Sequence, residues 1–512
     1  MIKNKSVVII GSGINGLVCA NYLRKVGFNV TILESSHKIG GACTSEKILI
    51  KKKEINYSTG ATVLGMMPDF IFKETGLSNK ITSFSPSHPK LVYFPGDKKS
   101  TKIYKDSNKL SKELRLKWDE KGDMIAFRED KNRIVDFIRK GYKNGETPCL
   151  EKAKAFLGDK LTELWISGNA KELLDHYFTS EKTKIYMGMT VIESGPTSIK
   201  SPFSAFTIPL MDSGSIFNGY WGYVKGGIGE ITKKLGEIND VLNIKTQLNI
   251  SIESIDSYKC IIKYNLKSKS FKLDYDYLIF ATDPITPSKL LGNTSLIENL
   301  NSKKYIGSSG KITVFFEQPV IWKENSTCKD FDSAFRFIFS IDTLEQFEDS
   351  SQKILNSNIE YEPGYIQVYC EGGAQRKLSN IEPFDKLIFF TKNFSFKSSS
   401  DQLTVIENKI KNMVFKHIVN PKDCVYSVFL SPLDLKEKFR FPMGNIDHLI
   451  LENDQTFNSR SFSTDKKNNF YRYWDYENIF YCGAGAYPCG SVAGTPGYIL
   501  SKQLYSLVLK EN

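Results

Sequence analysis

The chain has no long hydrophobic run, although 41% of its 512 residues are hydrophobic. A membrane-spanning helix needs about 20 consecutive apolar residues, and runs such as residues 277–281 are far shorter. The short apolar stretch near the N-terminus leads directly into a glycine motif, so we interpret it as a buried strand and not as an export signal. We therefore expect a globular protein of the cytoplasm, with roughly two to four domains for this length.

Clustered metal ligands and disulfide patterns are also lacking. The nine cysteines include no C-x-x-C pair, and the five histidines show no metal-ligand spacing. A disulfide framework or a zinc site would need tighter and more regular spacing. We predict reduced thiols and no metal.

The chain lacks an acidic excess, because 69 basic and 57 acidic residues give a formal charge of +12. A basic excess can attract nucleic acid or an anionic membrane. Here the lysines are spread along the chain, and residues 51–53 form the one dense run. We expect a solvated surface, no nucleic-acid partner and at most weak peripheral contact with a membrane. The oligomeric state does not follow from the sequence.

What the sequence does contain is an N-terminal βαβ pattern. Residues 6–10 are apolar and rich in β-branched side chains, which is typical of a buried parallel strand. The glycine motif of residues 11–16 follows, and a helical pattern then extends to Gly27. A second strand, residues 29–33, ends at Glu34, where a carboxylate can accept hydrogen bonds from ribose hydroxyls. Its negative charge disfavours the 2′-phosphate of NADP.

Each residue of the glycine motif has an expected function. Gly11 permits the tight turn, Gly13 lets the backbone approach a pyrophosphate, and Gly16 lets the helix pack closely on the strand. Ile14 and Asn15 begin the helix, whose free N–H groups and partial positive charge suit phosphates.

The segment after Glu34 distinguishes FAD from NAD. It runs from Ser35 to Ala42 and contains the pair Gly40-Gly41. This pair resembles the glycines that follow the ribose acid in two-dinucleotide-fold flavoproteins, where bare backbone passes the diphosphate and the ribityl chain. A simple loop after the strand is the alternative.

Later segments extend the pattern. A β-rich run surrounds Ile250, and a buried-strand pattern ends at Ala281-Thr282. Near the C-terminus, a strand enters the turn Gly483-Ala484, and a loop containing Val492 leads to a helix that starts near Pro496. The dipole of this helix could stabilise negative charge on a reduced flavin. The candidate cofactor-binding residues are Gly11, Gly13, Ile14, Asn15, Gly16, Glu34, Ser35, Gly40, Gly41, Ala42, Ile250, Ala281, Thr282, Gly483, Ala484 and Val492.

Together with residues 225–229 and 444–448, these motifs resemble the phytoene-desaturase-like branch of the flavin amine oxidase superfamily. The resemblance implies an α/β, two-dinucleotide-binding-domain flavoprotein with a Rossmann-like FAD domain and a discontinuous α+β substrate domain. The FAD domain would comprise residues 1–68, 220–292 and 475–512, and the substrate domain residues 69–219 and 293–474. No cysteine or histidine matches a familiar attachment motif, so we expect noncovalent FAD.

The chain also departs from this branch. Tyr487 stands where the branch usually has a histidine before proline, and Cys489 and Ser491 interrupt the usual run of glycines. Lys311 matches the position where flavin amine oxidases place a lysine that holds a water near flavin N5, with a plain strand-end lysine as the alternative. His448 could act as an acid or base because its unperturbed pKa lies near neutrality, or it could simply be packed beneath the substrate domain. Lys311, His448 and Tyr487 are the catalytic candidates.

The resemblance implies an FAD-dependent oxidoreductase that takes hydride from a C–H bond of a small, hydrophobic or conjugated organic substrate. Three alternatives stay open: an amine or amino-acid oxidase that uses oxygen, a redox-neutral flavin isomerase, and a non-enzymatic escort protein of the same fold. The tail lacks the aromatic residue ahead of Gly-Ala that is usual in the oxidases, and the intact glycine motifs argue against the escort protein. The substrate and the electron acceptor do not follow from the sequence.

Overall fold

The N-terminal strand β1 (Ser6–Ile10) lies at the centre of a five-stranded parallel sheet in the computed structural model, which describes residues 5–87, 89–193, 195–324 and 326–510. The strand order is β19–β13–β1–β2–β9. The other members are β2 (Asn29–Leu33), β9 (Lys245–Gln247), β13 (Tyr277–Phe280) and β19 (Ile479–Tyr481). Segments from the start, the middle and the end of the chain therefore meet in one sheet.

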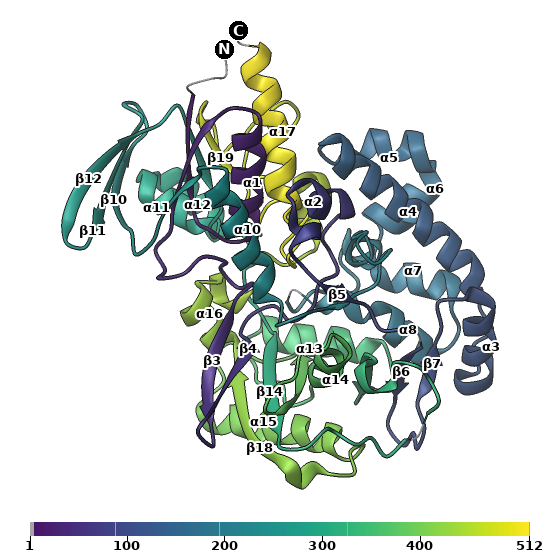
Figure 1. Cartoon of the computed structure of the whole chain (residues 1–512). Coiled ribbons are helices and arrows are strands. Elements are labelled where there is room, and N and C mark those ends of the chain that lie inside the picture. The colour runs from purple at the N-terminus through teal and green to yellow at the C-terminus, as the bar shows by residue number, and fades with distance from the viewer. Residues whose placement is uncertain (1–4, 88, 194, 325, 511–512) are drawn as a thin grey trace.

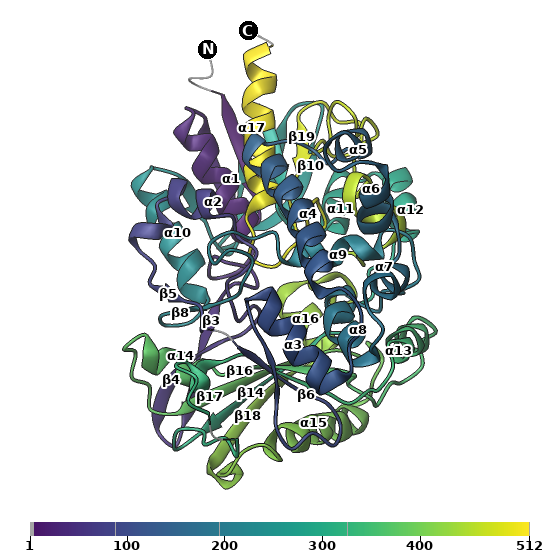
Figure 2. The same cartoon turned by 90° about the vertical axis from the view of Figure 1, so that its right-hand side faces the viewer.

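Helices cover this sheet and explain why its strands are apolar throughout. Residues 7–10 of β1 are all buried, as expected for a parallel strand that is covered on both faces. Helix α1 (Ile14–Lys25) packs against α10 (Gly229–Val241) and against the last helix, α17 (Thr495–Lys510). Figures 1 and 2 both show α17 lying beside α1.

A second, seven-stranded sheet occupies the lower half of Figure 1 and has the order β18–β14–β17–β16–β15–β6–β7. Its outer face packs against α15 (Ser400–Phe415), and its inner face joins the large core shared with the first sheet. The strands are β6 (Lys90–Tyr93), β7 (Thr101–Ile103), β14 (Gly310–Phe316), β15 (Arg336–Phe339), β16 (Tyr365–Tyr369), β17 (Asp385–Thr391) and β18 (Cys424–Leu430).

Helices between β7 and β8 (Tyr223–Val224) form a separate layer beside both sheets (Figure 1). They are α3 (Ser107–Trp118), α4 (Met124–Asn144), α5 (Leu150–Leu157), α6 (Asp159–Thr162), α7 (Ala170–Tyr177), α8 (Glu181–Gly188) and α9 (Thr207–Met211). The remaining α-helices are α2 (Asp69–Glu74), α11 (Ile285–Leu291), α12 (Thr294–Asn301), α13 (Glu345–Leu355), α14 (Glu371–Lys377) and α16 (Pro432–Phe439).

Three small sheets complete the structure. Strands β10 (Ser251–Asp256), β11 (Ile261–Leu266) and β12 (Lys269–Asp274) form one, and β5 (Ser83–Phe84) pairs with β8. Strands β3 (Ser45–Ile50) and β4 (Lys53–Ser58) form a hairpin. Its turn holds the lysine run, with Lys51 and Lys52 in the left-handed region.

The predicted α/β fold class with a Rossmann-like sheet is confirmed. The predicted strands 6–10 and 29–33 form as expected, and so does the predicted C-terminal helix. The boundaries of two discontinuous domains stay a prediction, although strands from all three stretches assigned to the FAD domain share the parallel sheet.

The contact between α1 and α17 generates a stability prediction. A Cβ atom on Gly497 would lie 2.1 Å from the carbonyl oxygen of Asn15 and 3.1 Å from the backbone nitrogen of Cys19. We expect Gly497→Ala to lower the free energy of unfolding by about 1–3 kcal/mol, because the two helices must move apart. Chemical denaturation measures the change.

Gly141→Ala in α4 is the matched control, because a Cβ atom there meets no atom within 4 Å. This variant should keep its stability or gain up to about 1 kcal/mol from the higher helix propensity of alanine. Equal stability of the two variants would contradict the close packing of α1 on α17.

Candidate functional site

The glycine motif forms a turn whose backbone is closely packed on one side and open on the other. Gly11 has φ +101°, and a Cβ atom on Gly16 would lie 2.3 Å from the Gly11 oxygen. Both positions therefore require glycine, as predicted from the turn and the helix packing. A Cβ atom on Gly13 would meet nothing within 4 Å, so the backbone there borders open space.

The second glycine pair lies against the first motif. Gly40 donates its N–H to the Ser12 oxygen at 2.9 Å, and its φ is +114°. Gly41 has φ +56°, and a Cβ atom there would lie 3.3 Å from the Cα atom of Gly13. Two stretches of bare backbone thus run side by side next to the open space at Gly13.

Glu34 is nearly buried, with 9% of its surface exposed, and it faces the same turn. Its Oε2 accepts hydrogen bonds from the Ser12 N–H and the Ser12 hydroxyl, both at 2.7 Å. Its Oε1 accepts from the Ser36 N–H at 2.8 Å and from the Ser35 hydroxyl at 3.4 Å. Since a carboxylate offers about four acceptor positions, a ribose hydroxyl would take the place of a serine hydroxyl. The N–H of Ile250 donates a hydrogen bond to the backbone oxygen of Glu34 at 2.9 Å.

The ends of β13 and β19 bring the later candidates to the same edge. The N–H of Ala281 donates a hydrogen bond to the backbone oxygen of Ile10 at 2.8 Å. Ala281 also lies beside the glycine motif, because a Cβ atom on Gly16 would be 3.0 Å from the Ala281 Cβ. A Cβ atom on Gly483 would lie 2.0 Å from the Thr282 oxygen. These segments therefore meet at the carboxyl end of the parallel strands, where such sheets bind ligands.

The loop before α17 holds its backbone in an uncommon conformation. Ser491 and Val492 both have φ +58°, and Gly494 follows with φ +71°. A β-branched valine is strongly disfavoured in this region, and such strain persists where the surroundings or a ligand site demand it. The predicted cofactor-binding residue Val492 therefore has a strained backbone, and its contact with the cofactor stays a prediction.

Buried polar atoms without partners test whether a dinucleotide fits here. In the described part of the chain, Asn15 Oδ1 and Thr495 Oγ1 are buried and have no hydrogen-bond partner. They lie in the first turns of α1 and α17, where helix N–H groups also favour anionic groups. The Thr495 hydroxyl can donate to a phosphate oxygen, and Asn15 Oδ1 can accept from a sugar hydroxyl. Together with the open backbone at Gly13, they suit a dinucleotide.

Lys311 is buried, and all three of its N–H groups have partners. Its Nζ donates to the backbone oxygens of Ser58, Gly60 and Ala61, at 2.6, 2.9 and 3.2 Å. Burial lowers the pKa of Lys311 to about 7, against the attraction of Glu371. Because Ala61 in turn donates its N–H to the Ala42 oxygen at 2.9 Å, the lysine fixes the segment beside the second glycine pair.

His448 and Tyr487 lie in tightly packed surroundings. Burial lowers the pKa of His448 to about 4, with Asp283 opposing the shift, and its Nδ1 has no partner in the described part of the chain. Tyr487 packs among aromatic rings, and burial raises the pKa of its hydroxyl. Among the described residues, the three catalytic candidates share no hydrogen bond with one another, so their catalytic roles stay predictions.

Sequence reasoning missed Arg460 and Asp447, which connect the tail to the rest of the site. Arg460 is buried, and its guanidinium group donates hydrogen bonds to four backbone oxygens. These belong to Asp447, Ala484, Gln455 and Ala486, at 2.7, 3.0, 2.9 and 3.3 Å. Asp447 Oδ1 accepts from the Gly490 N–H at 3.0 Å, and burial raises the pKa of this carboxyl. Asp447 lies in the segment 444–448 that carried part of the resemblance, but no local pattern marks Arg460.

The glycine-lined carboxyl edge of a parallel sheet, closed by a second sheet, is typical of the class of Rossmann-type dinucleotide-binding proteins. Residues 9–69 match the family model of the NAD(P)-binding Rossmann-like domain. The mouse pyridine nucleotide-disulfide oxidoreductase domain-containing protein 2 is 22% identical, over 96% of this chain and 91% of that protein. A phytoene desaturase from Fusarium fujikuroi is 24% identical, over 65% of this chain and 60% of that protein.

Solved structures show the same fold. Putrescine oxidase bound to putrescine has a TM-score of 0.59 at 12% identity, over 99% of both chains. Cyclohexylamine oxidase from Brevibacterium oxydans has a TM-score of 0.58 at 13% identity, over 99% of both chains. The predicted resemblance is confirmed: the chain is similar in sequence to phytoene desaturases and has the fold of putrescine oxidase and cyclohexylamine oxidase.

The buried Lys311 generates a prediction about pH. Below about pH 7 both the folded and the unfolded protein hold the Lys311 proton, and burial costs its full amount. Between about pH 7 and pH 10.4 the unfolded chain alone keeps the proton, so stability rises with pH. Relative to Lys311→Met, the wild type should therefore gain up to about 1.4 kcal/mol of unfolding free energy per pH unit in this window.

Lys386→Met is the matched control for this measurement. Lys386 lies on the same face of the sheet, but its Nζ pairs with Glu382 at 2.5 Å. Denaturation of all three proteins at pH 7, 8 and 9 gives the comparison. A difference between wild type and Lys311→Met that does not change with pH would contradict a lysine with a lowered pKa.

Proposed function

We propose that the protein binds FAD noncovalently and takes hydride from a C–H bond of a small lipophilic substrate, as a desaturase or dehydrogenase. The observation that carries the proposal is the pairing of Gly13 with Gly41 beside Glu34, which leaves bare backbone next to open space. FAD supplies a ring that accepts the hydride, and the protein supplies binding and orientation.

The geometry supports the following assignment of cofactor-binding residues. Backbone N–H groups at the start of α1 would bind the diphosphate, and Glu34 would accept a hydrogen bond from the ribose. The N-terminal end of α17, with Thr495, would favour negative charge at the ring. The strained segment at Ser491 and Val492 lies between the Gly483 turn and this helix, which supports its role at the edge of the cofactor.

Lys311 supports the desaturase proposal over the oxidase alternative. An amine or amino-acid oxidase of this fold would use the lysine to hold a water near the flavin. Here all three N–H groups of Lys311 are bound to the backbone oxygens of residues 58, 60 and 61. The lysine therefore positions the loop beside the second glycine pair. A redox-neutral isomerase would use the same residues, and the balance of products distinguishes it from a dehydrogenase.

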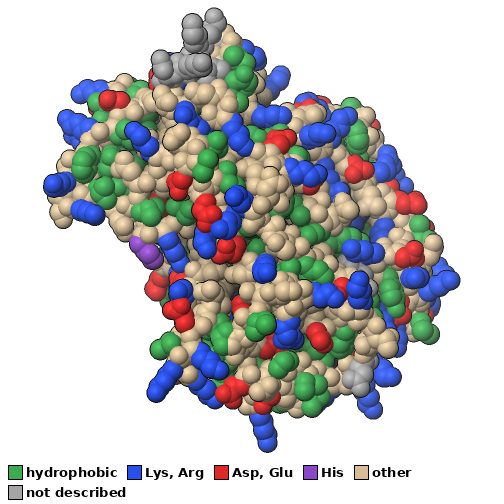
Figure 3. Space-filling model, viewed as in Figure 1, with side chains coloured by type: hydrophobic (Ala, Val, Ile, Leu, Met, Phe, Trp, Pro, Cys, Tyr) green, Lys and Arg blue, Asp and Glu red, His purple; other side chains and the backbone are tan. Residues whose placement is uncertain are grey.

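We keep a weak peripheral membrane contact and a cytoplasmic location as parts of the proposal. None of the described helices combines the length and hydrophobicity that a membrane crossing requires. Figure 3 shows lysine and arginine side chains distributed over many elements of the visible face. This distribution fits a small organic substrate better than a nucleic acid.

Anaerobic bleaching of the bound flavin tests the function. The purified protein is mixed with lipophilic alkenes, alcohols, amines and amino acids, and the loss of flavin absorbance is followed over time. We expect bleaching by lipophilic compounds and little by amino acids. Bleaching by amines alone, with release of hydrogen peroxide in air, would establish the oxidase instead, and a colourless protein that binds no FAD would exclude both.

Replacement of Glu34 tests the cofactor site. Glu34→Ala removes the carboxylate that fixes the Ser12 turn, and charge-assisted hydrogen bonds contribute roughly 1.5–3 kcal/mol each. We expect FAD affinity to fall by about tenfold or more, measured by titration of the apoprotein. Glu253→Ala, at an exposed acid of β10, is the control and should bind FAD normally.

The same preparations test the mode of attachment. Acid precipitation should release all of the yellow colour, because we propose no covalent bond. Colour that stays in the pellet would contradict noncovalent binding, whereas unchanged affinity of Glu34→Ala would contradict the ribose contact.

A further inference from the structure

The inner face of the seven-stranded sheet carries a row of side chains that starts at Lys311. Strand pairing places Lys311, Phe390, Gln367, Phe337 and Val92 directly beside one another, on β14, β17, β16, β15 and β6. With about 4.8 Å between neighbouring strands, Gln367 lies about 10 Å from Lys311 along this row. The row thus extends from the segment beside the second glycine pair into the protein interior.

Gln367 holds the carboxyl group of Glu193 over this face. The Gln367 Nε2 donates to Glu193 Oε1, and the Tyr369 hydroxyl donates to Gln367 Oε1. The tyrosine therefore fixes which end of the amide faces Glu193. In the described part of the chain, the second oxygen of Glu193 has no hydrogen-bond partner, and the residue keeps partial exposure although protein surrounds it. This oxygen is therefore free to accept a hydrogen bond from a bound group.

Two lysines and a second carboxylate lie close enough to Glu193 to interact with it electrostatically. Lys392 Nζ donates to the backbone oxygen of Glu193 and to the Ser309 hydroxyl, the latter at 2.9 Å. Lys90 Nζ lies 5.7 Å from the centre of the Phe337 ring. Asp447, the second carboxylate, interacts electrostatically with Lys392, as Glu193 does.

This set of charges favours a neutral polar group. The formal charges of the two lysines and the two carboxylates balance, so a cationic or anionic ligand group gains little net attraction and still loses its hydration. A hydroxyl group loses less hydration, and it can donate to a carboxyl oxygen and accept from a lysine.

Asp447 links this cluster to the tail loop. Its Oδ1 accepts from Gly490, and its Oδ2 is buried without a partner in the described part of the chain. The adjacent Cys489 interacts electrostatically with both Asp447 and Glu193. The free oxygens of two acids therefore lie between the inner face of the sheet and the loop that we assign to the edge of the flavin.

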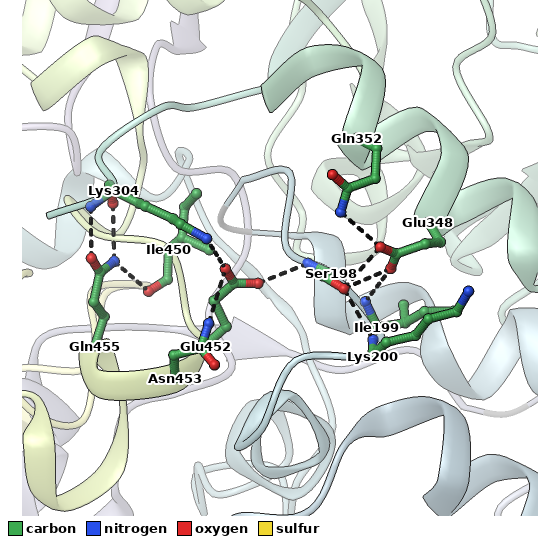
Figure 4. Close-up of polar contacts among 10 residues, drawn as sticks. All are labelled: Ser198, Ile199, Lys200, Lys304, Glu348, Gln352, Ile450, Glu452, Asn453 and Gln455. Atoms are coloured by element: carbon green, nitrogen blue, oxygen red, sulfur yellow. Dashed lines mark hydrogen bonds and ion pairs between the residues drawn. The ribbon is translucent and has the colours of Figure 1, made fainter. Parts of the chain in front are cut away.

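Two other buried acids nearby have a structural role, and their hydrogen bonds differ from those of Glu193. Figure 4 shows Glu348 and Glu452 converging on Ser198 from opposite sides. Glu348 accepts from the Ser198 hydroxyl and the Ile199 N–H, and Glu452 from the Ser198 N–H and Lys304 Nζ. Both acids use both oxygens and fix the segment a few residues after Glu193. Glu193 alone of the three keeps a free oxygen.

We propose that Glu193 binds the hydroxyl group of the substrate, so that the substrate is a lipophilic alcohol and not a plain hydrocarbon. This inference rests on the proposed function, because it places the alcohol in front of the flavin. Gln367 and Tyr369 are positioning residues that orient the carboxyl group.

Four compounds with one carbon skeleton test the proposal: farnesol, farnesene, farnesylamine and farnesoic acid. Their dissociation constants for the FAD-loaded protein are measured by perturbation of the flavin spectrum and by calorimetry. We expect farnesol to bind about tenfold or more tightly than farnesene, and more tightly than the amine or the acid. In Glu193→Met the preference for farnesol over farnesene should fall to about one.

Two further variants separate binding from folding. Glu193→Gln keeps the shape and one hydrogen-bonding oxygen, so part of the preference should return. Glu345→Gln removes an exposed acid on α13 and should keep the full preference. Melting temperatures of all variants verify that they are folded.

The outcomes are distinct. Equal affinity of the wild type for farnesol and farnesene, tightest binding of the amine or the acid, or no binding of any compound would overturn the assignment of Glu193. A preference for farnesol that survives Glu193→Met would overturn it as well. Bleaching by alkenes with no such preference leaves the proposed function intact and removes this inference, whereas binding of farnesol without any bleaching removes the proposed function.

Discussion

The approach of bare backbone to bare backbone at the carboxyl edge of the parallel sheet is the constraint on which the structure depends. Gly16 lies against the oxygen of Gly11, Gly41 against Gly13, and Gly497 against Asn15. A methyl group at Gly16 or Gly497 would lie within 2.3 Å of a carbonyl oxygen. These contacts bring the ends of α1, α17 and the second glycine pair close together, and they leave open space at Gly13.

Buried cations extend this arrangement beyond the first sheet. Lys311 joins β14 of the second sheet to residues 58–61, and Arg460 joins the Gly483 turn to the segment that contains Asp447. Each cation is satisfied by several carbonyl oxygens, which offsets much of the cost of burying its charge. The substrate side of the site is therefore held to the cofactor side by side chains that bind backbone.

The sequence predicted the parts of the site that local pattern encodes. Gly11, Gly13, Gly16 and Glu34 have a fixed spacing along a strand, a turn and a helix, so a single stretch of sequence specifies their geometry. Arg460 and Glu193 have no such pattern. Glu193 acquires its orientation from Gln367, 174 residues further along the chain, and strand pairing alone places Gln367 on the inner face. The resemblance singled out Lys311 as a lysine that holds a water near the flavin, whereas its three backbone partners depend on tertiary packing that no local pattern encodes.

The strand order of the parallel sheet has a consequence for how the protein is made. Strand β19 and helix α17 complete the sheet and cover α1, yet they come from residues 479–510 of a 512-residue chain. At typical rates of synthesis, tens of seconds pass between the emergence of β1 and that of β19. During this time the apolar side of α1 that later contacts α17 lacks its partner. The parallel sheet is therefore completed only after β19 has been made, and a chain that stops before β19 would have the glycine motif without the strand that completes the sheet.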